Sequence, residues 1–150
     1  MEQELPRLTR EAVTRAARLW LGTPYQHQAS LRGIGCDCLG LLRGVWRDLI
    51  GEEPEIPAPY TPAWAELSGG EPLLEAAMRH LLPVEDRLLR PGSVILFRWQ
   101  AHLPAKHCGI ATGESRFLHA HDGASVAEVA LVPGWRRRIA GVFDFPFLVD

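Results

Sequence analysis

Apolar residues in the first half of the chain recur with the period of amphipathic helices. Between Thr9 and Leu21 they fall at i, i+3, i+4 and i+7, which predicts a helix with Thr9 as its N-cap and Gly22 as its stop. Further helices are predicted by the same spacing and by flanking Pro or Gly: from Asp37 or Cys38 to about Ile50, after Thr61-Pro62, and over about 72–82.

The second half of the chain changes to short apolar runs between turn residues. Val94–Phe97 is a continuous apolar run, typical of a buried strand. Further short strands are predicted over 107–112, 116–120, 126–132 and 139–145. Helices followed by strands predict an α+β fold with a mostly antiparallel sheet of about five strands, on which the helix beginning near Asp37 packs.

Composition and charge narrow the function classes. The chain has 150 residues, the size of one domain, which we expect to span 1–150. A net charge of −2 gives no general attraction to nucleic acid or to anionic membranes, and no apolar stretch is long enough to span a bilayer. The basic run 136–138 is interpreted as a solvated rim.

The beginning of the chain and its cysteines bear on where the protein is made. Met1-Glu2-Gln3-Glu4 is acidic and leads directly into a helix, so we expect synthesis in the cytoplasm without a secretory signal. The cysteines are three in number, and Cys36 and Cys38 lie too close for an easy bridge. All three are therefore expected to be reduced thiols.

Cys38 is the candidate nucleophile. It follows a turn-forming glycine and stands in the first turn of a predicted helix, where backbone N–H groups and the helix dipole stabilise a thiolate. Cys36 lies in the preceding loop, outside that field, and Cys108 is expected to point into the core. The alternative is that Cys38 is an inert buried thiol.

His107 and His119, on two predicted strands, are the candidate base and orienting residue. A neutral imidazole accepts the thiol proton, and a polar group on its other nitrogen fixes its tautomer. The alternative is that one or both are hydrogen-bonded core histidines. The remaining histidines, including His121, are interpreted as surface or loop residues.

The hairpin that carries these histidines has two possible registers. A two-residue turn at Gly113-Glu114 would place His107 and His119 on opposite faces of the sheet. A three-residue loop would pair Gly109 with His119, put both imidazoles on one face, and gather Cys108, Ile110, Leu118 and Ala120 on the other. We predict the three-residue loop, because it brings the two histidines to one face and also gives the core a continuous apolar face.

Five segments in order resemble the NlpC family, which comprises papain-like cysteine peptidases of the bacterial cell wall. They are Gly22-Thr23-Pro24-Tyr25, Asp37-Cys38-Leu39-Gly40-Leu41, residues 91–97, His107-Cys108-Gly109-Ile110 and Leu118-His119-Ala120. The resemblance implies a papain-like fold and no cofactor. The sequence departs from the family pattern at Leu39, where the family usually has Ser. It also departs at Cys108, which replaces the usual Val and is a small apolar-for-apolar change.

Carried over by position, the resemblance implies a role for each site residue. Cys38 would be the nucleophile, His107 the general base and His119 the third, orienting residue. Tyr25 would sit beside the nucleophile and help the oxyanion site. Asp37 would contact the free amine of a peptidoglycan stem peptide, and the bond cleaved in this family is usually γ-D-glutamyl to diamino acid.

Two segments resemble the phage-type branch of the family more specifically. They are Gln26-His27-Gln28-Ala29-Ser30 and residues 135–143. That branch is encoded among tail genes of prophages and gene-transfer agents. The resemblance implies tail or baseplate proteins as partners, a place in the virion or particle, and action in the periplasm or cell wall.

Two other interpretations stay open at this point. The chain could be a structural tail protein that kept the scaffold and lost turnover. It could also hold zinc through Cys36-x-Cys38 and His119-x-His121, since alternate residues on a strand share a face.

Overall fold

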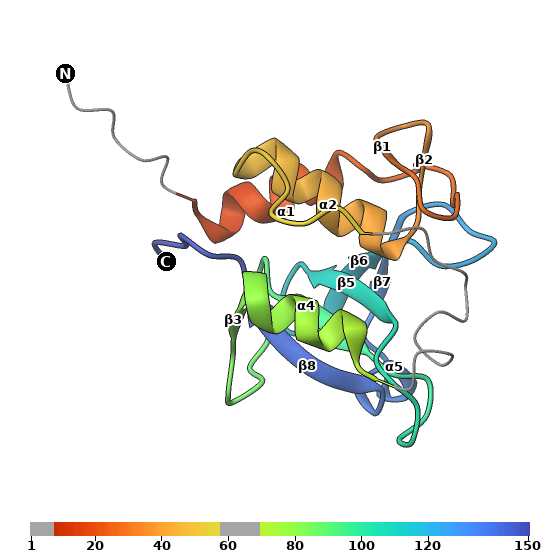
Figure 1. Ribbon diagram of the computed structural model, residues 1–150, viewed down its shortest axis with the longest axis vertical. Helices are drawn as coiled ribbons and strands as arrows, with labels where there is room; N and C mark the ends of the chain where they lie inside the picture. Colours follow the sequence, from red (N-terminus) through yellow and green to blue (C-terminus); the bar gives the residue numbers. More distant parts are fainter. Residues whose placement is uncertain (1–7, 58–69) are drawn as a thin grey trace.

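A six-stranded antiparallel sheet organises the computed structural model, which describes residues 8–57 and 70–150 (Figure 1). Its strand order is β3-β8-β4-β5-β6-β7. The strands are β3 (Leu82–Pro83), β4 (Val94–Phe97), β5 (His107–Ala111), β6 (Arg116–His119), β7 (Ala127–Ala130) and β8 (Ile139–Asp144). The predicted α+β class is confirmed, and the strand beyond the expected five is the two-residue β3.

The helices pack on the sheet in the predicted way. They are α1 (Arg10–Arg18), α2 (Cys38–Leu49), α4 (Pro72–His80) and the short α5 (Pro133–Arg136). Figure 1 shows α1 and α2 side by side over one face of the sheet, with the two-stranded hairpin of β1 (Ser30–Leu31) and β2 (Gly35–Cys36) beyond the start of α2. The predicted short helix after Thr61-Pro62 lies outside the described residues. No helix in the described ranges is both long and apolar enough to cross a membrane.

Side-chain caps explain where α1 and α2 begin. Thr9 Oγ1 accepts a hydrogen bond from Ala12 N at 3.0 Å, as predicted, and Asp37 Oδ1 accepts one from Gly40 N at 2.7 Å. The regular part of α1 ends at Arg18, earlier than predicted, and a turn carries the chain to Gly22 at φ +83°. The cap at Asp37 fixes Cys38 as the first residue of α2.

Close contact between α1 and α2 depends on a glycine. A Cβ on Gly44 would overlap the ring of Trp20, whose side chain is buried at 1% exposure. The indole therefore lies directly against the backbone of α2. This contact anchors the helix that carries Cys38.

Each face of the sheet has its own core. The larger core joins α1, α2 and α4 to the sheet face that carries Cys108, Ile110, Leu118 and Ala120. The smaller core lies on the other face around Phe97 and Phe117 and is covered in part by Trp135. Cys108 is 1% exposed, so its predicted place in the core is confirmed.

The β5–β6 hairpin has the predicted three-residue loop. Ile110 pairs with Leu118, Ala111 pairs with Phe117, and Thr112 N donates to Arg116 O at 2.9 Å. In this register His107 and His119 lie on the same face.

Candidate active site

Cys38 lines a cavity of about 410 Å³ at the start of α2. The cavity wall includes Tyr25, Trp99, His107 and His121. The Cys38 side chain is partly buried, and its Sγ is 4.0 Å from Lys106 O. At the positive end of a twelve-residue helix, this position stabilises a thiolate.

Neighbouring groups and burial give the three cysteine thiols different pKa values. A hydrogen bond from the Cys108 thiol holds the pKa of Cys38 well below its usual range; burial opposes this shift, and the charge and hydrogen bonding of His107 add to it. The same hydrogen bond, together with burial, raises the pKa of Cys108. Burial raises the pKa of Cys36 to about 12. Cys38 is therefore the thiol that ionises.

His107 and His119 form a buried hydrogen-bonded pair. His107 Nε2 lies 2.8 Å from His119 Nδ1, and the residues are 4% and 6% exposed. Burial, with the charge of His107 as a smaller cause, lowers the pKa of His119 to about 3, so His119 is neutral at neutral pH. An imidazolium at His107 donates from both nitrogens, and His119 Nδ1 then accepts. This pairing leaves Nδ1 of His107 for the Cys38 thiol.

Two tryptophans pack against the His107 ring and against each other, with 5.8 Å between their own ring centroids. Trp99 stacks on the His107 ring with ring centroids 5.2 Å apart and 27° between planes, and Trp135 stacks at 5.6 Å and 26°. Trp99 stands in no motif, and Trp135 begins the segment 135–143, whose resemblance to the phage-type branch implied no site role for it. Their role depends on the packing of the 98–106 loop and α5 around β5, which sequence periodicity does not predict.

Tyr25 lies on the cavity wall, whereas Asp37 is almost fully buried beside it. Tyr25 lines the cavity, and burial together with the neighbouring Cys38 raises its pKa to about 12, so its hydroxyl remains a donor. Asp37 is 3% exposed. Its Oδ1 accepts from Gly40 N, and its Oδ2 accepts from Gln28 N at 2.8 Å. Asp37 is thus first of all the helix cap, and it borders the cavity.

His121 belongs to the site, although its sequence position suggested only a surface residue. It is exposed, lines the cavity, and stacks on His119 with ring centroids 5.6 Å apart. One ring nitrogen from each of His107, His119 and His121 lies within 4.8 Å of the others. The sequence feature that could have indicated His121 is its position two residues after His119, because alternate residues of an extended chain lie on the same side.

The metal-ligand set considered from the sequence is not brought together. Cys36 is 0% exposed and belongs to the core beneath α1 and α2, and the described cluster of possible ligands contains neither Cys36 nor Cys38. His107 takes their place beside His119 and His121. The interpretation that Cys36 and Cys38 serve together as zinc ligands is therefore wrong.

Comparison with known proteins identifies the fold. No protein-family model matches the sequence. Murein DD-endopeptidase MepH of Escherichia coli (strain K12) is 25% identical over 123 residues, which cover 81% of this chain and 40% of MepH. The chain thus spans about two fifths of the length of this curated relative.

Solved structures agree with this relationship. A NlpC/P60 family protein from Bacillus cereus ATCC 10987 has a TM-score of 0.69 at 19% identity, covering 95% of this chain and 42% of its own. The NlpC/p60 domain of peptidoglycan hydrolase SagA has a TM-score of 0.61 at 19% identity, covering 92% of this chain and all of that domain. The chain therefore has the papain-like fold of NlpC/P60 proteins.

Proposed function

We propose that this chain is a cysteine peptidase that hydrolyses peptidoglycan stem peptides. The observation that carries the proposal is the Cys38 thiol, with its lowered pKa, facing His107, which is held by His119 at 2.8 Å. The relationship to a murein endopeptidase and to a peptidoglycan hydrolase domain supports the substrate class.

The reaction follows from the order of these groups. The Cys38 thiolate attacks the scissile carbonyl carbon, forming a C–S bond, and the carbonyl electron pair moves to oxygen. His107, protonated on Nδ1, gives its proton to the leaving amine as the C–N bond breaks. His107 then takes a proton from water, which attacks the thioester and releases the acid and the Cys38 thiolate.

Each remaining residue has a positioning or stabilising role in this proposal. His119 accepts from His107 Nε2 in the thiolate–imidazolium state and keeps the imidazolium turned toward sulfur. The Tyr25 hydroxyl and the Cys38 backbone N–H are donors for the tetrahedral oxyanion. Asp37 contributes negative charge near the cavity, where the free amine of a stem peptide would bind.

The bond proposed for cleavage is that between γ-D-glutamate and the diamino acid. This choice of bond comes from the resemblance of the segments around Cys38 and His107 to the NlpC family, whereas the MepH relative is named a DD-endopeptidase. Digestion of purified sacculi, followed by mass spectrometry of the released peptides, distinguishes the two. Cleavage after γ-D-glutamate releases fragments that begin with the diamino acid, whereas DD-endopeptidase action only separates cross-linked stems.

We further propose delivery to the wall by a phage tail or gene-transfer-agent particle. The supporting observation is the resemblance of residues 26–30 and 135–143 to the phage-type branch. The protein is then expected to co-purify with tail or baseplate components. Recovery of the mature protein from the periplasm of cells that make no phage-like particle would contradict this delivery.

A metal-dependent hydrolase is the second candidate, because three imidazoles converge beside the cavity. Metal binding would require His107 and His119 to give up their mutual hydrogen bond. In this case the purified protein would hold about one zinc per chain and lose activity to a chelator. The cysteine mechanism predicts activity that survives chelation. The structural tail protein predicts no released peptide under either condition.

A further inference from the structure

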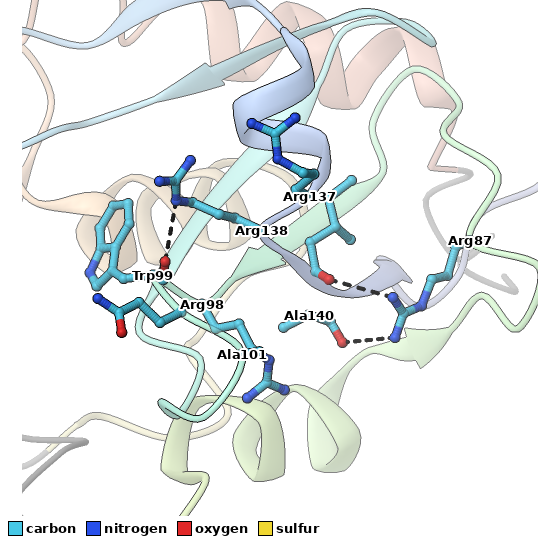
Figure 2. A pocket seen from close by; sticks show the side chains of 9 residues that line it. Arg87, Arg98, Trp99, Ala101, Arg137, Arg138 and Ala140 are labelled. Carbon is cyan, nitrogen blue, oxygen red and sulfur yellow. Dashed lines mark hydrogen bonds between the residues drawn. The ribbon is translucent and has the colours of Figure 1, made fainter.

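A second hollow, of about 450 Å³, is surrounded by arginines. Arg87, Arg98, Arg137 and Arg138 line it, together with Trp99 (Figure 2). The arginines come from three separate segments: the turn before β4, the end of β4, and the residues after α5. In Figure 2 Trp99 stands at one end of the hollow and Arg87 at the other.

Three of these arginines have no carboxylate partner in the described ranges. Arg98 forms a salt bridge with Glu71 at 2.7 Å. Arg87 donates instead to the carbonyls of Ile139 and Ala140, at 3.4 and 3.2 Å. The hollow therefore has an excess of positive charge.

Arg138 and Arg137 complete the group. Arg138 donates to Trp99 O at 3.3 Å and to Gly134 O at 2.8 Å, which positions its guanidinium at the Trp99 end. Arg137 is exposed, its backbone N–H donates to Pro133 O at 3.0 Å, and its guanidinium has no hydrogen-bond partner within the described part of the chain. Each guanidinium keeps N–H groups for a ligand, and this fork matches a carboxylate.

Trp99 connects this hollow with the candidate active site. It lines both cavities, and its ring stacks on His107. His107 donates its proton to the leaving amine, so the leaving part of a substrate must pass close to His107. A leaving part that extended past Trp99 would reach the arginines.

We propose that this arginine pocket, formed by Arg87, Arg137 and Arg138, binds the C-terminal carboxylate of the leaving half of the substrate. The leaving half of any cleaved peptide bears the new amine at one end, and a stem peptide ends in a free carboxylate at the other. The pocket would thus select short peptides with an uncapped C-terminus. This inference rests on the proposed function, since it assumes that the peptide is cut at Cys38.

The test compares two sets of synthetic stem tri- and tetrapeptides that differ only in a C-terminal carboxylate or carboxamide. The wild-type chain should show a KM about five- to tenfold lower for the acids, the value expected for one partly exposed charge-assisted contact. Arg137→Gln should remove this preference by raising KM for the acids, with kcat and the amide KM unchanged. Arg136→Gln is the matched control, because Arg136 donates to Glu114 O and does not line the hollow.

The outcomes separate the pocket from the peptidase proposal. Equal KM values for acid and amide peptides in the wild-type chain would overturn the pocket, as would an equal effect of both arginine substitutions.

If no peptide is cleaved, calorimetric binding of the same peptides to the wild-type chain decides whether the pocket exists. A preference for the acid peptides that Arg137→Gln abolishes supports the pocket although the peptidase proposal has failed. Equal binding overturns both. Inhibition by inorganic phosphate alone, lost in Arg137→Gln without any acid preference, would reassign the pocket to phosphate.

Discussion

The Cys108 thiol donates a hydrogen bond to the backbone carbonyl of Cys38 at 3.3 Å, and the presence of this thiol beside Cys38 lowers the pKa of the Cys38 thiol. From the sequence, Cys108 was interpreted as an apolar replacement for the valine usual in the NlpC family. In the structure it is a polar neighbour of the proposed nucleophile and the foremost cause of the lowered pKa of Cys38. A valine at this position has no S–H to donate.

Cys108→Val should raise the pKa of Cys38 and move the acid limb of the kcat/KM profile to higher pH. The removed hydrogen bond stabilises the thiolate, so more thiol remains protonated at a given pH. The rate of iodoacetamide labelling of Cys38 against pH reports the same shift. Cys36→Ala is the control and should leave both profiles in place. An unchanged acid limb in Cys108→Val would show that Cys108 does not tune the nucleophile.

His119 should make the fold less stable in acid. Its pKa is about 3 in the folded chain, whereas an unfolded histidine titrates near its ordinary value of about 6.5. Between these values the unfolded chain binds more protons, so stability is full above about pH 6.5 and falls as the pH decreases toward 3. The slope contributed by this one group is about 1.4 kcal/mol per pH unit.

Urea unfolding at a series of pH values measures this contribution. His119→Asn should flatten the dependence between pH 6 and 4. His102→Asn, at an exposed position, should retain it. A His119→Asn chain with the wild-type slope would mean that another group carries the acid sensitivity.

Gly44→Ala should destabilise the fold despite the better helix propensity of alanine. The new methyl group would overlap the buried Trp20 ring, so Trp20 or α2 must shift, at a cost of about 1–3 kcal/mol. Gly113→Ala is the matched control, because nothing lies within 4 Å of its added Cβ. Equal unfolding free energies for the two variants would contradict the close packing of Trp20 on α2.

Local rules predicted the elements that carry the site. The cap at Thr9, the start of α2 at Cys38 and the three-residue loop of the β5–β6 hairpin all depend on residues near in sequence. The shared face of His107 and His119 followed from register alone. These elements could be predicted because capping and strand alternation operate over a few residues.

Long-range packing decided what the sequence could not predict. Trp99 and Trp135 reach His107 from different segments, and His121 joins the site from the residues after β6. The arginine pocket likewise joins Arg87 to Arg137 across fifty residues of chain. Asp37 differs from its predicted role for a local reason. The residue was expected to contact substrate, but its carboxylate accepts hydrogen bonds from the backbone N–H groups of Gln28 and Gly40.

The central claim is that Cys38, with His107 as its base, hydrolyses peptidoglycan stem peptides. The most direct measurement is the mass of the peptides released from purified sacculi by the wild-type, Cys38→Ala and Cys36→Ala chains. We predict stem-peptide fragments from the wild-type and Cys36→Ala chains, and none from a folded Cys38→Ala chain. Release by Cys38→Ala, or its loss only in Cys36→Ala, would contradict the account.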